Sequence, residues 1–235
     1  MRLHPASRFL AAAAVLVLGA AAPALAHHGK DFLVVETYEL PHPGHVFLLS
    51  NQDLVRAGGE TAYSFTPGVL LGVTDRFAAE LHAHFEKAPG EGWAFEAIAP
   101  AVRLQLTRPD SSLRLAVSAE YEFGRGEAPD ELEGRLIVGY RGAVNIAANL
   151  VFGHARGSGE GTDVGYAIGV RPARETRVVV GAEAQGNFRG PDAHEVLGGV
   201  YFTPSERLTV KIAVGTGFGE AGVDLTVRTG VVLGF

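Results

Sequence analysis

Cysteine is absent from the 235-residue sequence, so no disulfide bridge stabilises the fold and no lipid can be attached through a cysteine. A chain that works outside the cytoplasm without disulfides needs a large core, a bound metal or a closed sheet. Basic residues are also in the minority, with 20 Lys and Arg against 26 Asp and Glu and a formal net charge of −6. Nucleic-acid-binding domains present a basic face, so we expect no nucleic-acid partner.

Long apolar runs are missing after Ala26, where no uninterrupted run approaches the roughly 20 residues that a transmembrane helix needs. Before that point, Arg2 and Arg8 precede an apolar run over residues 9–22, and the stretch ends in Ala-Leu-Ala. This order predicts a signal peptide over residues 1–26 that is cleaved after export through the inner membrane. The alternative is a membrane-anchoring helix, for which the apolar run is short.

Alternation with a period of two is the strongest pattern in the remaining chain. From residue 77 to residue 86 every second residue is apolar, and the positions between them include Glu80, His82, His84 and Glu86. The same alternation recurs over residues 113–123 and near the end of the chain. Successive side chains of a strand point to opposite faces, so each such segment is expected to be a strand with one apolar and one polar face.

Twelve strands of this kind can be placed along the chain. They are long for a soluble protein, whose strands usually have about 5–6 residues, and they suit a tilted transmembrane strand of about 9–11 residues. We therefore predict an all-β fold, a single closed antiparallel transmembrane β-barrel over residues 45–235, with short periplasmic turns. A soluble periplasmic β-sandwich is the alternative, although it would leave strand edges to protect. The predicted strands are 45–57, 61–74, 76–87, 93–107, 112–124, 131–141, 143–154, 162–172, 175–188, 193–203, 206–218 and 222–235.

The last strand ends at Phe235 and alternates apolar with polar residues. It resembles the insertion signal that the barrel-assembly machinery of Gram-negative bacteria reads, which implies that machinery and outer-membrane lipid as partners. Aromatic girdles are expected at both membrane interfaces, with Tyr140 and Tyr201 near the periplasmic ends of their strands. The resemblance implies that the protein is located in the outer membrane.

The polar face of each strand is expected to line the lumen. Most acidic residues on this face fall toward the outer end of the barrel and most basic residues toward the periplasmic end. These charges either neutralise one another through cross-strand pairs or set up a field along a pore. The predicted pore-lining residues are Glu80, His82, His84, Glu120, Arg135, Glu183, Lys211 and Arg228.

The segment over residues 27–44 lies between the predicted signal peptide and the barrel and has no alternation. It is expected to form either a periplasmic segment or a plug inside the lumen. Histidines are the candidate metal ligands, namely His27 and His28 in this segment and His82 and His84 on the lumen face. Imidazole with carboxylate suits several transition metals, although a solvated polar lumen explains the same residues. We expect no cofactor.

Barrels that hydrolyse outer-leaflet lipids combine Ser and His near the outer rim, so a lipid hydrolase is a further alternative. No HxSN-type or GxSxG motif is present in the sequence. We therefore predict that the protein is not an enzyme, and lipid hydrolysis is the least favoured alternative.

Two segments resemble barrels associated with the phenol meta-degradation pathway, which transport small molecules. Residues 67–77 (PGVLLGVTDRF) are similar to their strand–turn–strand Gly-x-Thr-Asp-Arg, and residues 200–208 (VYFTPSERL) are similar to their later hairpin. The resemblance implies a passive channel or transporter for a small solute through a charged lumen. The alternative that the residues leave open is a structural or metal-binding barrel with a plugged lumen.

Overall fold

The structure, a computed structural model, describes residues 30–108, 111–126, 128–156, 162–173, 176–189, 192–219 and 222–235. The predicted signal peptide, His27 and His28 lie outside these residues. The strands are β1 (Val46–Ala57), β2 (Glu60–Thr74), β3 (Phe77–Lys87), β4 (Ala94–Gln105), β5 (Leu113–Gly124), β6 (Glu131–Arg141), β7 (Val144–Ala155), β8 (Asp163–Pro172), β9 (Val178–Arg189), β10 (His194–Ser205), β11 (Leu208–Phe218) and β12 (Leu225–Gly234).

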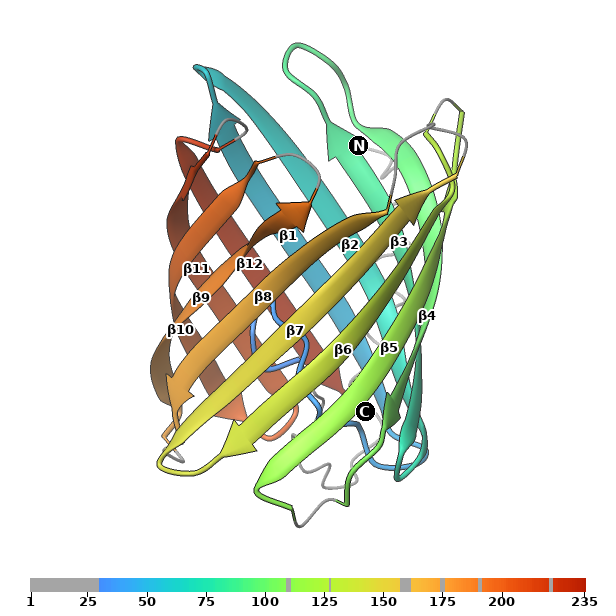
Figure 1. Ribbon diagram of the computed structural model, residues 1–235, viewed down its shortest axis with the longest axis vertical. Helices are drawn as coiled ribbons and strands as arrows, with labels where there is room; N and C mark the ends of the chain where they lie inside the picture. Colours follow the sequence, from blue (N-terminus) through green and yellow to red (C-terminus); the bar gives the residue numbers. More distant parts are fainter. Residues whose placement is uncertain are drawn as a thin grey trace, which may run out of the picture.

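The strands form one closed barrel in which each strand pairs antiparallel with the next along the chain (Figure 1). Closure is made by β1 and β12, which pair from Phe47 opposite Gly234 to Arg56 opposite Leu225. The prediction of a closed antiparallel barrel of about twelve strands is therefore confirmed. The β-sandwich alternative is wrong, because the sheet has no free edge.

Alternation along each strand separates an apolar outer face from a largely polar lumen. On β3, for example, Leu81 is 47% exposed on the outside, while Ala78 and Glu80 are buried inside. Tyr201 lies near the end of β10 as predicted, but its predicted place in an aromatic girdle at the membrane interface is wrong. It is 2% exposed and lies in the lumen, and the neighbouring Phe202 faces outward. The adjacent Gly198 and Gly199 weaken the alternation along β10. Without a clear alternation the register can be placed one residue off, and a shift of one residue exchanges the two faces of the strand.

The turns between successive strands alternate between the two ends of the barrel. We call the end that holds Phe235 and the turns after β2, β4, β6, β8 and β10 the C-terminal end, and the opposite end the loop end (Figure 1). Three turns at the C-terminal end are tight, with β2–β3, β6–β7 and β10–β11 each separated by two residues. At the loop end β1 and β2 are joined by Gly58 and Gly59, whose φ angles of +59° and +87° fit a tight hairpin turn that glycine favours.

No helix in the described part of the chain has the length and hydropathy that crossing a membrane by a helix requires.

The segment before β1 enters the interior of the barrel. Residues 30–43, which we call the plug, form no strand and contact side chains of β3, β4, β7, β9 and β11. These strands lie on different sides of the barrel, so the plug crosses the lumen. It is the blue coil in the half of the barrel that holds the C-terminus (Figure 1).

Candidate functional site

The first anchor of the plug is a carboxylate on β9. Glu183 accepts hydrogen bonds from three successive backbone N–H groups, those of Leu33 at 2.9 Å, Val34 at 2.8 Å and Val35 at 3.2 Å. The Tyr201 hydroxyl donates a fourth hydrogen bond of 2.7 Å to the same carboxylate. Glu183 is only 2% exposed, so these four donors replace the water that a buried carboxylate requires.

The second set of anchors pairs further backbone groups of the plug. The Asn149 amide accepts from the backbone N–H of Glu36 at 2.8 Å and donates to the carbonyl of Glu36 at 2.9 Å. The Lys211 ammonium donates to the carbonyls of Lys30 at 3.1 Å and Phe32 at 2.6 Å. The plug lies in no sheet, so side chains of the barrel wall provide the partners that its buried backbone groups need.

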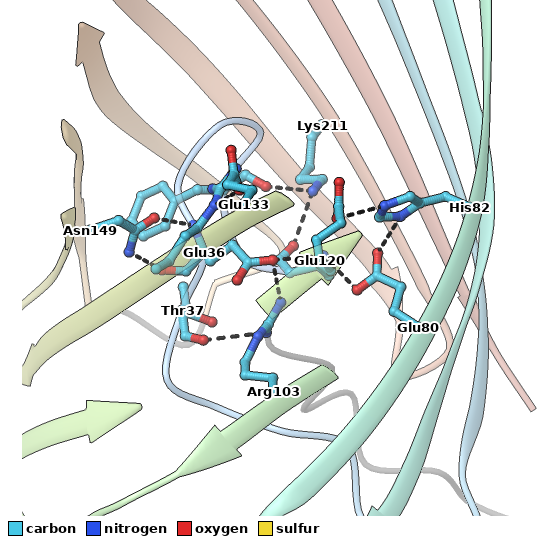
Figure 2. A network of polar contacts seen from close by, with 12 residues as sticks. Glu36, Thr37, Glu80, His82, Arg103, Glu120, Glu133, Asn149 and Lys211 are labelled. Atoms are coloured by element: carbon cyan, nitrogen blue, oxygen red, sulfur yellow. Dashed lines mark hydrogen bonds and ion pairs between the residues drawn. The ribbon is translucent and has the colours of Figure 1, made fainter. Parts of the chain in front are cut away.

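The third set of anchors is ionic (Figure 2). Arg103 lies 2.7 Å from the Glu36 carboxylate and donates to the Thr37 carbonyl at 3.3 Å, while Lys30 lies 2.7 Å from the carboxylate of Glu80. Burial alone would raise the pKa of Glu36, but the charges of Arg103 and Lys30 hold that pKa well below its usual range. The plug is therefore held by a charged network with members on both the plug and the wall.

Apolar side chains of the plug fill the space between these anchors. Tyr38 packs on Ala116 and Ile137, with its ring over Gly139. A Cβ at Gly139 would lie 1.8 Å from the Tyr38 ring, and one at Gly169 would lie 2.9 Å from the ring of Phe32. The wall is thus shaped to the plug. The other contacts are Phe32 and Val35 with Ala147, Ala167 and Tyr201, and Leu40 with Phe47, Leu49, Leu70, Ala78 and Val232.

Cavities lie on both sides of the plug. One of about 380 Å³ opens at the loop end and another of about 600 Å³ at the C-terminal end. A third cavity of about 300 Å³ borders the plug at Lys30 and at residues 32–36. The space beside Glu36 and Arg103 is only about 10 Å³, which is at the limit of holding a single water molecule. The plug and its partners therefore fill the lumen beside Glu36 and Arg103.

The lining of the two larger cavities differs in charge. Glu131, Glu133 and Asp163 line the cavity at the loop end, together with Arg135 and Arg228. The cavity at the C-terminal end is lined by Arg141, Arg171 and Arg177, together with Asp31, Glu39 and Glu206. Acidic wall residues gather toward the loop end and basic wall residues toward the C-terminal end.

The eight predicted pore-lining residues all lie on strands with their side chains turned inward, and they fall into three groups. Glu80, Glu183 and Lys211 contact the plug. A second group, His82, His84 and Glu120, lies together on β3 and β5. The last two form ion pairs within the wall, Arg135 with Glu133 and Arg228 with Asp53 and Glu195.

Several anchors of the plug were not among the predicted site residues, including Arg171, which pairs with Asp31 at 2.8 Å, and Arg141, which pairs with Glu39 at 3.2 Å. Arg103 and Asn149 sit on the polar face of their strands, so alternation places them in the lumen without showing what they bind. Tyr201 was expected in the aromatic girdle at the membrane interface rather than in the lumen. A polar residue among small ones, such as Asn149 after Ala147 and Ala148, is the sequence signal that could have identified an anchor.

The comparison with solved structures agrees with the observed fold. No protein-family model matches the chain, and no curated protein matches it in sequence. Among solved structures, an outer-membrane channel from Pseudomonas putida F1 has a TM-score of 0.62 at 11% identity, covering 83% of this chain and 97% of its own. The KdgM porin has a TM-score of 0.60 at 9% identity over 80% of this chain and 99% of its own. The NanC porin has a TM-score of 0.55 at 10% identity over 80% and 98%. The predicted resemblance to outer-membrane barrels is confirmed as a likeness of fold.

Proposed function

We propose that this chain is a passive channel for small solutes in the Gram-negative outer membrane, and that its own N-terminal plug closes the channel at rest. The observation that carries the proposal is the plug, which is anchored across the lumen between two cavities of about 380 and 600 Å³. The fold that the chain shares with outer-membrane channels and porins supports the location. In this proposal β12 is the strand that the assembly machinery reads.

Apolar side chains cover the outside of the barrel, which supports contact with lipid. Exposed Leu, Ile, Val and Phe side chains occur on strands all around the barrel, and soluble proteins rarely expose apolar patches of this extent. Tyr63, Trp93, Phe123, Phe188 and Phe218 are exposed near the loop end, as an interfacial girdle requires. The outer face therefore has the band and the rim of a transmembrane barrel.

Replacing Ile168 by Arg tests this location. Ile168 lies near the middle of β8, faces outward and is 45% exposed. We expect the substitution to lower the free energy of unfolding from lipid bilayers by about 2–4 kcal/mol, because an arginine at the bilayer midplane faces hydrocarbon. The matched control is Leu113→Arg at the first position of β5, near the interface, where about 0–1 kcal/mol is expected. Equal effects at the two positions, measured by denaturant titration in vesicles, would argue against a membrane-spanning barrel.

Solute movement in this proposal is diffusion along a lumen whose two ends differ in charge. Acidic residues at the loop end would attract cations, and arginines at the C-terminal end would favour anionic groups. A zwitterionic or weakly charged small molecule could pass both ends. The plug crosses the lumen, so in this proposal it moves aside before a solute passes.

Deleting residues 27–43 from the mature chain is expected to produce large, stable conductance steps in planar bilayers, where the intact protein gives small or rare ones. All twelve strands and their pairs lie outside this segment, so the barrel should still form, which heat-modifiable gel migration would check. If the deleted chain folds and stays silent, the channel proposal fails. A folded, silent barrel would favour the alternative of a structural barrel with a filled lumen.

A further inference from the structure

Two histidines and a carboxylate come together on the lumen wall above the plug. His82 and His84 on β3 and Glu120 on β5 each offer one ligand atom, and these atoms all lie within 4.8 Å of one another. Residues two apart on a strand point to the same side, which places both imidazoles in the lumen. All three side chains border a cavity of about 300 Å³ that an ion could reach.

His82 is already oriented as a metal ligand would be. Its Nδ1 lies 3.1 Å from Glu80 and its Nε2 lies 2.8 Å from Glu120 (Figure 2). Metal-binding histidines commonly donate one ring N–H to a carboxylate, which fixes the tautomer and leaves the other nitrogen for the metal. Glu80 is itself held by Lys30 at 2.7 Å, so this supporting carboxylate is fixed in place.

His84 adds an independent observation. Its Nε2 is buried and has no hydrogen-bond partner among the described residues. The nearest carboxylate oxygen, on Glu122, is 3.8 Å away, too far for a hydrogen bond. The rings of His82 and His84 lie 5.3 Å apart between centroids at an angle of 79°. A buried ring nitrogen without a partner beside a second imidazole is the arrangement that a bound cation would complete.

The surrounding wall carries an excess of negative charge. Glu120 lies directly opposite Glu133 across the β5–β6 pair, and Glu122 lies opposite Glu131. Like charges directly opposite one another destabilise a sheet. Arg135 contacts Glu133 and so offsets the charge of one of these four carboxylates. A cation bound beside Glu120 would offset part of the remaining repulsion.

We propose that His82, His84 and Glu120 bind a divalent transition-metal ion such as Zn²⁺. Two imidazoles and one carboxylate suit Zn²⁺, Cu²⁺ and Ni²⁺ better than Mg²⁺ or Ca²⁺, which prefer oxygen ligands. A tetrahedral Zn²⁺ site with bonds of about 2.0–2.1 Å places its ligand atoms roughly 3.3 Å apart. Side-chain rotations that bring the three atoms closer by up to about 1.5 Å would form it. The fourth position faces the cavity and is open to water or to a carboxylate of a passing solute.

The simpler explanation of the same contacts is an ion-pair chain, in which a protonated His82 bridges Glu80 and Glu120. The two explanations differ at His84, which takes no part in that chain but is a ligand in the metal site. Removing the His84 imidazole therefore separates them. The polar groups near His84, which are those of Glu122, His82 and Glu120, all belong to the wall. Loss of the His84 imidazole should therefore leave the closed lumen unchanged.

The experiment is Zn²⁺ binding to the refolded barrel, measured by competition with a chromophoric chelator. All proteins carry His27→Ala and His28→Ala, because two adjacent histidines near a chain terminus can bind Zn²⁺ themselves. We expect about one ion per barrel, with affinity lowered at least about tenfold by His84→Ala and by His82→Ala, and no comparable binding of Mg²⁺. His154→Ala, an exposed histidine on β7 outside the cluster, is the matched control and should bind like the parent.

Two results would overturn the metal site. One is a parent barrel, shown to be folded by gel migration, that binds no Zn²⁺. The other is unchanged affinity in His84→Ala, which would leave only the ion-pair chain. Loss of folding in His82→Ala does not affect this decision, because His84→Ala decides it alone. The binding assay needs no conductance, so failure of the metal site and failure of the channel proposal are distinguishable.

Discussion

Replacing Glu183 by Ala is expected to open the channel. The carboxylate accepts hydrogen bonds from the backbone N–H groups of Leu33, Val34 and Val35 and from the hydroxyl of Tyr201. In the closed state the variant leaves these donors buried without an acceptor. In the open state the plug donors reach water. The substitution thus raises the free energy of the closed state relative to the open one.

The size of the effect follows from the charged hydrogen bonds. Each hydrogen bond to a charged group contributes about 1.5–3 kcal/mol. If only one or two of the three hydrogen bonds from the plug contribute their full energy, the closed state is destabilised by about 3 kcal/mol. Because about 1.4 kcal/mol corresponds to a factor of ten, the ratio of open to closed barrels should rise by about a hundredfold or more. Single-channel recording in planar bilayers measures this ratio as open probability.

Glu195→Ala is the matched control. Glu195 is also a buried lumen carboxylate, but its contacts are Gln185 and Arg228 on the wall. Its removal should change ion selectivity without raising the open probability. Similar opening in both variants would mean that loss of any lumen carboxylate loosens the barrel, and the anchoring role of Glu183 would be rejected. A closed Glu183→Ala barrel would contradict that role directly.

The barrel itself was predictable from the sequence because its determinants are local. Alternation fixes which side chains meet lipid and which meet the lumen, and turn residues fix where each strand ends. For example, the predicted strand over residues 175–188 corresponds to β9, Val178–Arg189. Errors arise where alternation weakens, as at Tyr201, since a strand with glycines on both faces gives no pattern to align.

The position of the plug could not be derived in the same way. Residues 27–44 have no periodic pattern, so the sequence left both a periplasmic segment and a plug open. What holds the plug is a set of side chains far away along the chain, such as Glu183, which is 150 residues from Leu33. Alternation predicted that Glu183 and Lys211 face the lumen, but nothing local shows that their partners are backbone groups.

The histidine cluster could be predicted from the sequence only in part. The spacing of His82 and His84 on one strand predicted that both imidazoles share the lumen face. Glu120 on β5 reaches the two histidines across β4, which lies between β3 and β5. This proximity depends on the strand register and on the curvature of the barrel wall. The supporting contact from Lys30 to Glu80 depends on the plug, so it could not be predicted from the strands alone.

Gly139→Ala is expected to release the plug by a steric route that leaves every charged anchor intact. The new Cβ would lie 1.8 Å from one ring carbon of Tyr38, and the ring is 4% exposed and packed against Ala116 and Ile137. Overfilling a packed site costs about 1–3 kcal/mol, which corresponds to roughly a fivefold to hundredfold rise in the ratio of open to closed barrels. The backbone of β6 pairs on both sides, so the ring of Tyr38 is what must move.

A second substitution at Tyr38 shows whether this contact is the cause. Tyr38→Ala alone removes a buried ring and should also favour the open state, since emptying an aromatic site costs about 3–5 kcal/mol. In the double variant the methyl group introduced at position 139 meets no ring. The combined effect should therefore be smaller than the sum of the two single effects by about 1 kcal/mol or more, on the order of coupling between residues in contact. Gly198→Ala is the control, because a Cβ there meets nothing within 4 Å, and it should gate like the parent. If the effects of Gly139→Ala and Tyr38→Ala are strictly additive, the substitution at position 139 acts on the barrel wall and not through Tyr38. The plug would then be rejected as the part that moves.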